Sequence, residues 1–151
     1  MKNSQKVIVS RVLLLQNGSV YLMLRNGKGT KHGTNIKRWI SPGGLADPGE
    51  DAITSAVRET KEELGIFIKP ENLTLVLKKY DPMFNADMYF YVCKEWKGKI
   101  SIPDTEKEKF DRAEWIKLKN VNKLENETEK LGIYMNDAIL SIGNQPVYTR
   151  W

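Results

Sequence analysis

The chain has 151 residues, of which 40% are hydrophobic and 28% charged, a composition typical of one soluble globular domain. No apolar run approaches the roughly 20 residues that span a bilayer, and residues 1–6 lead into the first apolar run without a signal-peptide cleavage site, so we expect no membrane segment and a cytoplasmic location. The net charge of +5 favours anionic partners, and because the lysines are scattered along the chain, small phosphorylated molecules are favoured over nucleic acid.

The first third of the chain predicts a β-hairpin followed by a basic, glycine-rich loop. Residues 7–15 are rich in leucine and β-branched residues, and residues 20–25 alternate as a returning strand should. Asn17-Gly18 lies between them and is the strongest short hairpin signal. The loop is expected over residues 26–37. Ser41-Pro42-Gly43-Gly44 then predicts a turn that interrupts regular structure.

A helix is predicted over residues 51–64, where the apolar spacing changes to i, i+3, i+4, i+7. Asp51, or Glu50 beside it, is placed to cap its first turn. Gly65 suits the left-handed conformation in which many helices end. The residues expected on its buried face are Ile53, Ala56, Val57, Thr60 and Leu64.

The rest of the chain predicts further strands and two helices. Strands are expected at residues 73–80, 88–96 and 112–118, with a tight turn at Lys97-Gly98 that leads into residues 99–102, and weaker helical patterns cover residues 121–131 and 133–142. Cys93, the single cysteine, lies in an apolar stretch without a partner, which indicates a buried thiol and a reducing compartment. No repeat or linker interrupts the chain, so residues 1–151 are expected to form a single mixed α/β domain.

Three glutamates crowd the polar face of the first predicted helix. Glu59, Glu62 and Glu63 fall within an arc of about 100°, since each residue advances a helix by about 100°. Like charges at these spacings repel one another, so the arrangement stabilises nothing unless a cation neutralises it. Hard oxygen ligands suit Mg²⁺ or Mn²⁺, which take further ligands from substrate phosphates. For the trio alone, a solvated helix surface is the plainer explanation.

The residues around the trio extend it into a longer pattern. Gly44 is followed by Glu50, by Arg58-Glu59 and by the run from Glu62 to Ile66, a combination that average residue usage makes very rare. The 23-residue segment from Gly44 to Ile66 resembles the Nudix box, a loop–helix–loop signature, and matches it at every fixed position. Thr60 is a mild departure, because an aliphatic residue is usual there. The strong resemblance to the Nudix (MutT-like) hydrolase superfamily covers this segment only.

The resemblance implies an α/β Nudix fold, in which a mixed β-sheet is sandwiched between α-helices. It implies that divalent ions, Mg²⁺ or Mn²⁺, bind to Glu59, Glu63 and Glu62, with the carbonyl of Gly44 as a further ligand. Arg58 and Glu50 are expected to orient this cluster through a charge pair, with a helix cap as the alternative role for Glu50. The number of ions stays open.

The implied reaction is attack of water on a phosphorus of a diphosphate, assisted by the metal ions and by a general base. In the family the base is a box glutamate or one from a later loop. Here the segment before the strand at residues 112–118 carries Glu106 and Glu108. We favour Glu108 as metal ligand or base, and a solvated charged turn is the alternative.

Substrate contacts are expected from basic and aromatic residues outside the box. Arginines would meet phosphates, and aromatic rings would stack on a base; the candidates are Arg25, Arg38, Tyr80 and Phe84. Lys28, Lys31 and Lys37, in or beside the glycine-rich loop, are further candidates for phosphate contact, and ordinary surface lysines are the alternative. The single histidine, His32, is expected to face solvent.

The substrate is the least determined part of the prediction. Pro82 lies 16 residues after Ile66, a spacing similar to a marker of the ADP-ribose pyrophosphatase subgroup. This favours a nucleoside diphosphate linked to another moiety, such as ADP-ribose, a nucleotide sugar or a dinucleotide. A MutT-like nucleoside triphosphate, an RNA 5′ end and a non-catalytic nucleotide-binding module stay open as alternatives, and the complete set of box carboxylates argues against the last. Many relatives dimerise, so a homodimer also stays open.

Overall fold

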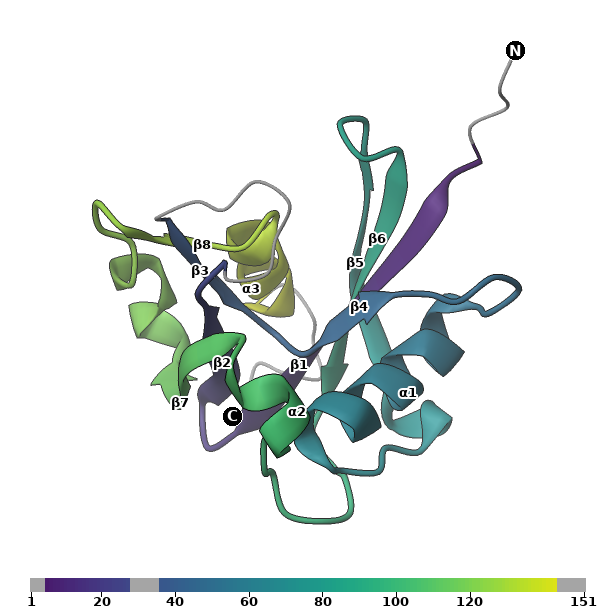
Figure 1. Ribbon diagram of the computed structural model, residues 1–151, viewed down its shortest axis with the longest axis horizontal. Helices are drawn as coiled ribbons and strands as arrows, with labels where there is room; N and C mark the ends of the chain where they lie inside the picture. Colours follow the sequence, from purple (N-terminus) through teal and green to yellow (C-terminus); the bar gives the residue numbers. More distant parts are fainter. Residues whose placement is uncertain (1–4, 28–35, 144–151) are drawn as a thin grey trace.

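A mixed β-sheet forms the centre of the computed structural model, which describes residues 5–27 and 36–143 (Figure 1). Within these residues eight strands form one sheet, whose main path runs β5-β6-β1-β2-β3-β8, while β4 pairs with β1 and β7 with β2. The strands are β1 (Val7–Gln16), β2 (Ser19–Arg25), β3 (Lys37–Ile40), β4 (Gly43–Leu45), β5 (Thr74–Asp81), β6 (Ala86–Cys93), β7 (Phe110–Lys117) and β8 (Glu129–Leu131).

The parallel pairing of β1 with β6 determines where the first helix lies. The two strands pair from Val7↔Ala86 to Leu14↔Cys93, and parallel neighbours need a long crossover connection. Helix α1 (Ala52–Leu64) lies in that connection and packs on β1 and β4. It buries Ala56 and Leu64 in one core cluster with side chains of the central strands.

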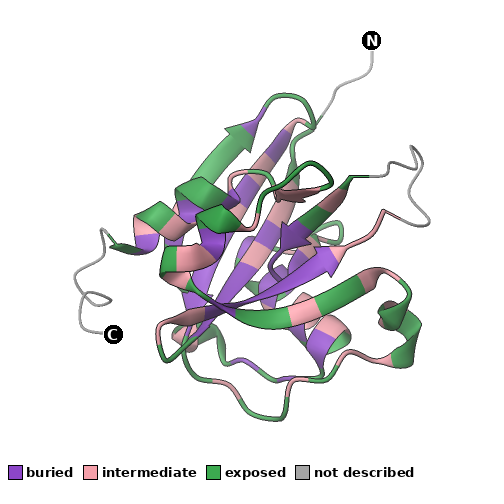
Figure 2. Ribbon diagram, turned by 90° about the vertical axis from the view of Figure 1, so that its left-hand side faces the viewer, coloured by how far each residue is buried: buried purple, intermediate pink, exposed green. Residues whose placement is uncertain are grey.

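A second helix covers the other face of the sheet. Helix α3 (Met135–Gly143) packs in a separate core cluster, and alternate residues of β1 enter the two clusters: Leu13 on the α3 side and Leu14 on the α1 side. Three short helices, η1 (Pro70–Asn72), α2 (Asp104–Lys107) and η2 (Leu118–Lys123), connect the strands. Figure 2 shows the buried residues concentrated along the strands. The predicted mixed sheet between helices is therefore confirmed.

The predicted hairpin and the ends of α1 are confirmed by local geometry. Asn17 and Gly18 both have positive φ, 53° and 75°, as the tight turn between β1 and β2 requires. The Asp51 carboxylate accepts a hydrogen bond from the Thr54 amide at 2.8 Å and so caps the helix, and Gly65 ends it at φ 72°.

The buried face of α1 differs from the prediction at Ile53, and Val57 is only partly buried. Ile53 is 37% exposed, so its predicted burial is wrong. The first turns instead bury the small residues Ala52, Ser55 and Ala56, which let the helix approach β1 closely. Ser55 accepts a hydrogen bond from the Ser10 hydroxyl at 3.3 Å across this contact.

Two further predictions about local structure are wrong, each because of a contact that the pattern did not reveal. Residues 43–45 form strand β4 instead of a turn, since they pair with β1. Residues 121–131 form η2 and β8 instead of one helix, because the Asn126 side chain accepts the amides of Thr128 and Glu129 and β8 pairs with β3.

Cys93 lies at the end of β6 and is buried, as predicted. Burial raises the pKa of its thiol to about 11, which keeps the sulfur protonated and unreactive at neutral pH. None of the helices in the described part of the chain has the length and apolarity to cross a membrane.

Candidate active site

The candidate site is built where β4 runs between β1 and helix α1. β4 pairs antiparallel with β1 through Ser10↔Gly44 and Arg11↔Gly43, and α1 packs on both strands. Position 43 requires glycine, because its φ is 146° and a Cβ there would lie 2.0 Å from the carbonyl oxygen of Ser10. The sequence therefore places bare backbone, without a side chain, against the helix.

Two of the predicted glutamates contact this glycine backbone. Glu63 Oε1 accepts a hydrogen bond from the Gly43 amide at 2.8 Å. A Cβ added to Gly44 would lie 3.0 Å from the carboxylate of Glu59. The structure thus brings Glu59, Glu63 and Gly44 together, while Glu62, the third member of the predicted trio, is exposed at the edge of the group.

Arg58 holds the carboxylates on the polar face of α1. Its Nε and Nη2 donate to the two carboxylate oxygens of Glu50 at 2.8 and 2.9 Å, and its Nη1 donates to Glu59 at 3.0 Å and to Glu62 at 3.2 Å. The Arg58 hydrogen bond, with help from the Asp47 amide, lowers the pKa of Glu50 to about 2. The predicted charge pair is present, and Asp51 instead of Glu50 caps the helix.

Burial raises the pKa of the two inner glutamates. For Glu63 the pKa rises to about 7, chiefly by burial, although the Gly43 amide and Arg11 both favour the charged form. For Glu59 burial again raises the pKa, against the influence of Arg58. Carboxylates held away from water favour a positive charge beside them.

Arg11 on β1 is a site residue that the sequence analysis missed. Its charge interacts with Glu63 and Glu59, and its Nη1 donates to the carbonyl of Ser41 at 3.2 Å. The available signal was an arginine within the apolar run of residues 7–15. A charge in a buried strand needs an opposite charge nearby, but the pattern could not say which one.

The fit of a divalent metal can be tested on these contacts. Among the described residues no three His, Cys, Asp or Glu side chains are gathered as a ready metal cluster, because Arg58 and the Gly43 amide hold the carboxylates. The donor set nevertheless suits a hard cation, because partly buried carboxylate oxygens on α1 lie against backbone that has no Cβ in the way. The residues present therefore fit Mg²⁺ or Mn²⁺.

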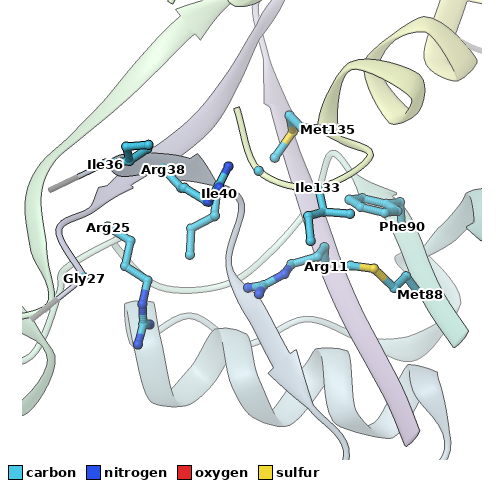
Figure 3. Close-up of a pocket in the computed structure, with 11 residues that line it drawn as sticks. Arg11, Arg25, Gly27, Ile36, Arg38, Ile40, Met88, Phe90, Ile133 and Met135 are labelled. Carbon is cyan, nitrogen blue, oxygen red and sulfur yellow. The ribbon is translucent and has the colours of Figure 1, made fainter. Parts of the chain in front are cut away.

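A cavity of about 280 Å³ opens beside these residues (Figure 3). Arg11 lines it together with both predicted substrate arginines, Arg25 and Arg38. Its apolar wall includes Ile40 from β3 and Phe90 from β6. The structure thus joins the two predicted arginines to the glutamate site through Arg11.

The two aromatic candidates do not line this cavity. Tyr80 is 48% exposed on β5, where its hydroxyl donates to Asn85, and Phe84 is 60% exposed in the turn between β5 and β6. Phe90, which the sequence analysis did not select, supplies an aromatic ring in the cavity. Lys28, Lys31 and His32 lie outside the described residues.

The segment before β7 places Glu106 nearer to the site than Glu108. Glu106 is close enough to Glu63 to contribute to its raised pKa, and its carboxylate accepts hydrogen bonds from Lys109 at 3.2 Å. Glu108 is exposed, and its backbone carbonyl accepts from Asn26. The catalytic role suggested for Glu108 stays a prediction, and Glu106 is the better placed of the two.

Comparisons with known proteins agree with this geometry. A family model described as the NUDIX domain matches residues 5–136. The chain is similar to the mouse "Nucleoside diphosphate-linked moiety X motif 6", at 32% identity over 93 residues, which are 60% of this chain and 29% of that protein. It is also similar to an asymmetrical bis(5′-nucleosyl)-tetraphosphatase of Caenorhabditis elegans, at 35% identity over 78 residues, 51% of this chain and 55% of that protein.

Among solved structures, the fold is similar to a MutT NUDIX hydrolase from Burkholderia pseudomallei. The TM-score is 0.69 at 20% sequence identity, and the match covers 91% of this chain and 98% of that one. At 20% identity, this similarity shows a shared fold and nothing more specific. The matched part of the chain spans between about a third and about half of the curated relatives' own lengths.

Proposed function

Because the chain belongs to the NUDIX domain family, we propose that it is a metal-dependent hydrolase that cuts a diphosphate bond in a nucleoside diphosphate linked to another moiety. The observation that carries this proposal is the contact of the Glu59 and Glu63 carboxylates with the glycine backbone of β4. Two partly buried acidic groups against bare backbone suit a cation better than they suit any structural purpose.

The proposed metal ligands are Glu59 and Glu63, with Glu62 and the carbonyl of Gly44 completing the set. A bound Mg²⁺ or Mn²⁺ supplies charge neutralisation of the diphosphate oxygens and a lowered pKa for an attacking water. Glu62 is exposed and Glu63 is partly buried. The proposed ligands therefore extend from the contact between α1 and β4 toward solvent, from where the substrate would enter.

Other residues of the chain position these groups. Arg58, held by Glu50 through two hydrogen bonds, fixes the direction of the Glu59 carboxylate. Arg11 lies between the glutamates and the cavity, where its guanidinium can bind a phosphate oxygen. Glu106, in the short helix α2 before β7, is the glutamate that we propose to accept the proton of the attacking water.

The names of the relatives support the proposed substrate class. One refers to a moiety linked to a nucleoside diphosphate and the other to a dinucleoside tetraphosphate, and both describe a nucleoside joined through phosphoanhydride bonds. The cavity also suits this class, because it combines an apolar wall with arginines.

The function is tested by a hydrolysis panel. ADP-ribose, diadenosine tetraphosphate, flavin adenine dinucleotide, UDP-glucose and nucleoside triphosphates are incubated with Mg²⁺ or Mn²⁺, and the products are identified by chromatography. We expect cleavage between phosphates of at least one diphosphate-linked compound, and no cleavage in EDTA. Preference for nucleoside triphosphates would favour the MutT-like alternative, and binding without cleavage of any compound would contradict the enzyme proposal.

Replacing Gly44 by alanine is expected to weaken metal binding without unfolding the domain. The new Cβ would lie 3.0 Å from the Glu59 carboxylate, which must therefore move. A displaced or disturbed ligand typically lowers metal affinity about 10- to 100-fold. Titration of Mn²⁺ followed by electron paramagnetic resonance measures this affinity. Gly143→Ala is the matched control, because a Cβ there meets nothing within 4 Å, and equal affinities in the two variants would contradict the assignment of Glu59.

A further inference from the structure

The lining of the cavity carries positive charge without negative charge. Arg11, Arg25 and Arg38 line it, and no aspartate or glutamate does so among the described residues. The remaining wall is largely apolar, with Ile36, Ile40, Phe90 and Ile133 among its members. A ligand consisting only of a neutral sugar or a base would leave the positive charge of the three arginines without a negative partner.

Arg25 and Arg38 lie directly opposite each other on neighbouring strands. They are register partners in the antiparallel pair of β2 and β3, so their side chains leave the sheet on the same face. Like charges in this position destabilise a sheet. Figure 3 shows both side chains at the cavity, together with Arg11 from β1, and the guanidinium groups of Arg25 and Arg38 are directed apart.

The positive charges next to Arg25 and Arg38 have anionic partners, whereas Arg25 and Arg38 have none among the described residues. Arg11 interacts with Glu63 and Glu59, and Lys37, next to Arg38, forms an ion pair with Asp111. Within the described part of the chain, neither Arg25 nor Arg38 forms a salt bridge with a carboxylate. A ligand anion would supply the negative charge that these two guanidinium groups lack, through charge-assisted hydrogen bonds.

We propose that the cavity selects substrates in which the half that enters it carries an anionic group of its own, a carboxylate or a phosphate, bound by Arg25 or Arg38. This rests on the proposed function and narrows its substrate class. Arg11, beside the glutamates, is the cavity arginine placed to meet the diphosphate, which leaves the other two for the additional anion. The apolar wall would contact the sugar or base that bears the additional anion.

Two matched pairs of compounds test the selection and separate the two kinds of anion. UDP-glucose and UDP-glucuronate differ by one carboxylate, and NADH and NADPH differ by one phosphate. Binding of each is measured by calorimetry in EDTA, which prevents metal-dependent turnover, and kcat/KM is measured separately with Mg²⁺. We expect the charged member of at least one pair to be favoured about tenfold or more, since hydrogen bonds between charged groups are among the stronger ones.

The double variant Arg25→Met/Arg38→Met should lose this preference, with a ratio between charged and neutral members below about threefold. Lys119→Met/Lys123→Met is the matched control for net charge, because it also removes two positive charges and both exposed lysines lie on η2, outside the cavity lining; it should retain the full preference. Equal binding of both members of both pairs by the wild type, or an unchanged preference in the double variant, would overturn the inference. Cleavage of the neutral compounds in that case would leave the proposed hydrolase function intact.

Discussion

Replacing Glu63 by glutamine is expected to lower kcat/KM by about a hundredfold or more, with the domain still folded. The side chain keeps its size, and its amide oxygen can still accept the hydrogen bond that Gly43 donates to Glu63 at 2.8 Å. What the variant loses is the negative charge that we propose to hold the metal. Steady-state hydrolysis of the best compound of the panel, at saturating Mg²⁺, measures the effect.

The matched control for this experiment is Glu71→Gln. Glu71 lies exposed on η1, so the substitution makes the same chemical change away from the site. The control should hydrolyse substrate as the wild type does. If the Glu63 variant kept more than a fifth of the wild-type rate, the metal assignment would be wrong, although the fold would stand.

The same variant should change how stability depends on pH. In the apoprotein, burial raises the pKa of Glu63 from 4.5 to about 7. Between these values the folded state holds a proton that the unfolded state releases, so the contribution of Glu63 to stability is present below pH 4.5 and is lost as the pH rises to about 7. The loss is at most about 1.4 kcal/mol per pH unit. Urea unfolding in EDTA at several pH values should show this slope reduced in the glutamine variant.

Replacing Gly43 by alanine is expected to destabilise the domain by about 3 kcal/mol or more, since steric overlap and an unfavourable φ act together. The new Cβ, whose position the backbone of β4 fixes, would lie 2.0 Å from the carbonyl oxygen of Ser10 in β1, and neither atom can rotate away. β4 would have to separate from β1, which would also move the amide that binds Glu63. Urea unfolding followed by circular dichroism measures the loss.

Gly18→Ala separates the effect of steric overlap from the effect of an unfavourable φ. Gly18 also has a positive φ, 75°, but a Cβ there meets nothing within 4 Å. Its substitution should therefore cost only the conformational penalty, about 1 kcal/mol. If both variants lost the same stability, the close approach of β4 to β1 would not be the reason for glycine at position 43.

Features that depend on residues a few positions apart could be predicted from the sequence. The hairpin at Asn17-Gly18, the caps of α1 at Asp51 and Gly65, and the pairing of Arg58 with Glu50 all have their partners within eight residues, and the structure contains each of them. The acidic face of α1 also follows from the helical period alone.

Features that depend on distant partners were decided by the tertiary structure. Residues 43–45 are a strand because β1 lies beside them, and residues 121–131 divide because β3 offers an edge to β8. Arg11 becomes a site residue only because β1 passes next to the Glu63 end of α1, and Arg25 meets Arg38 only through the register of β2 and β3. Periodicity and turn chemistry describe a residue's near neighbours, whereas strand pairing joins residues far apart along the chain. The chemistry of the box could therefore be predicted from the sequence, and the charge of the cavity beside it could not.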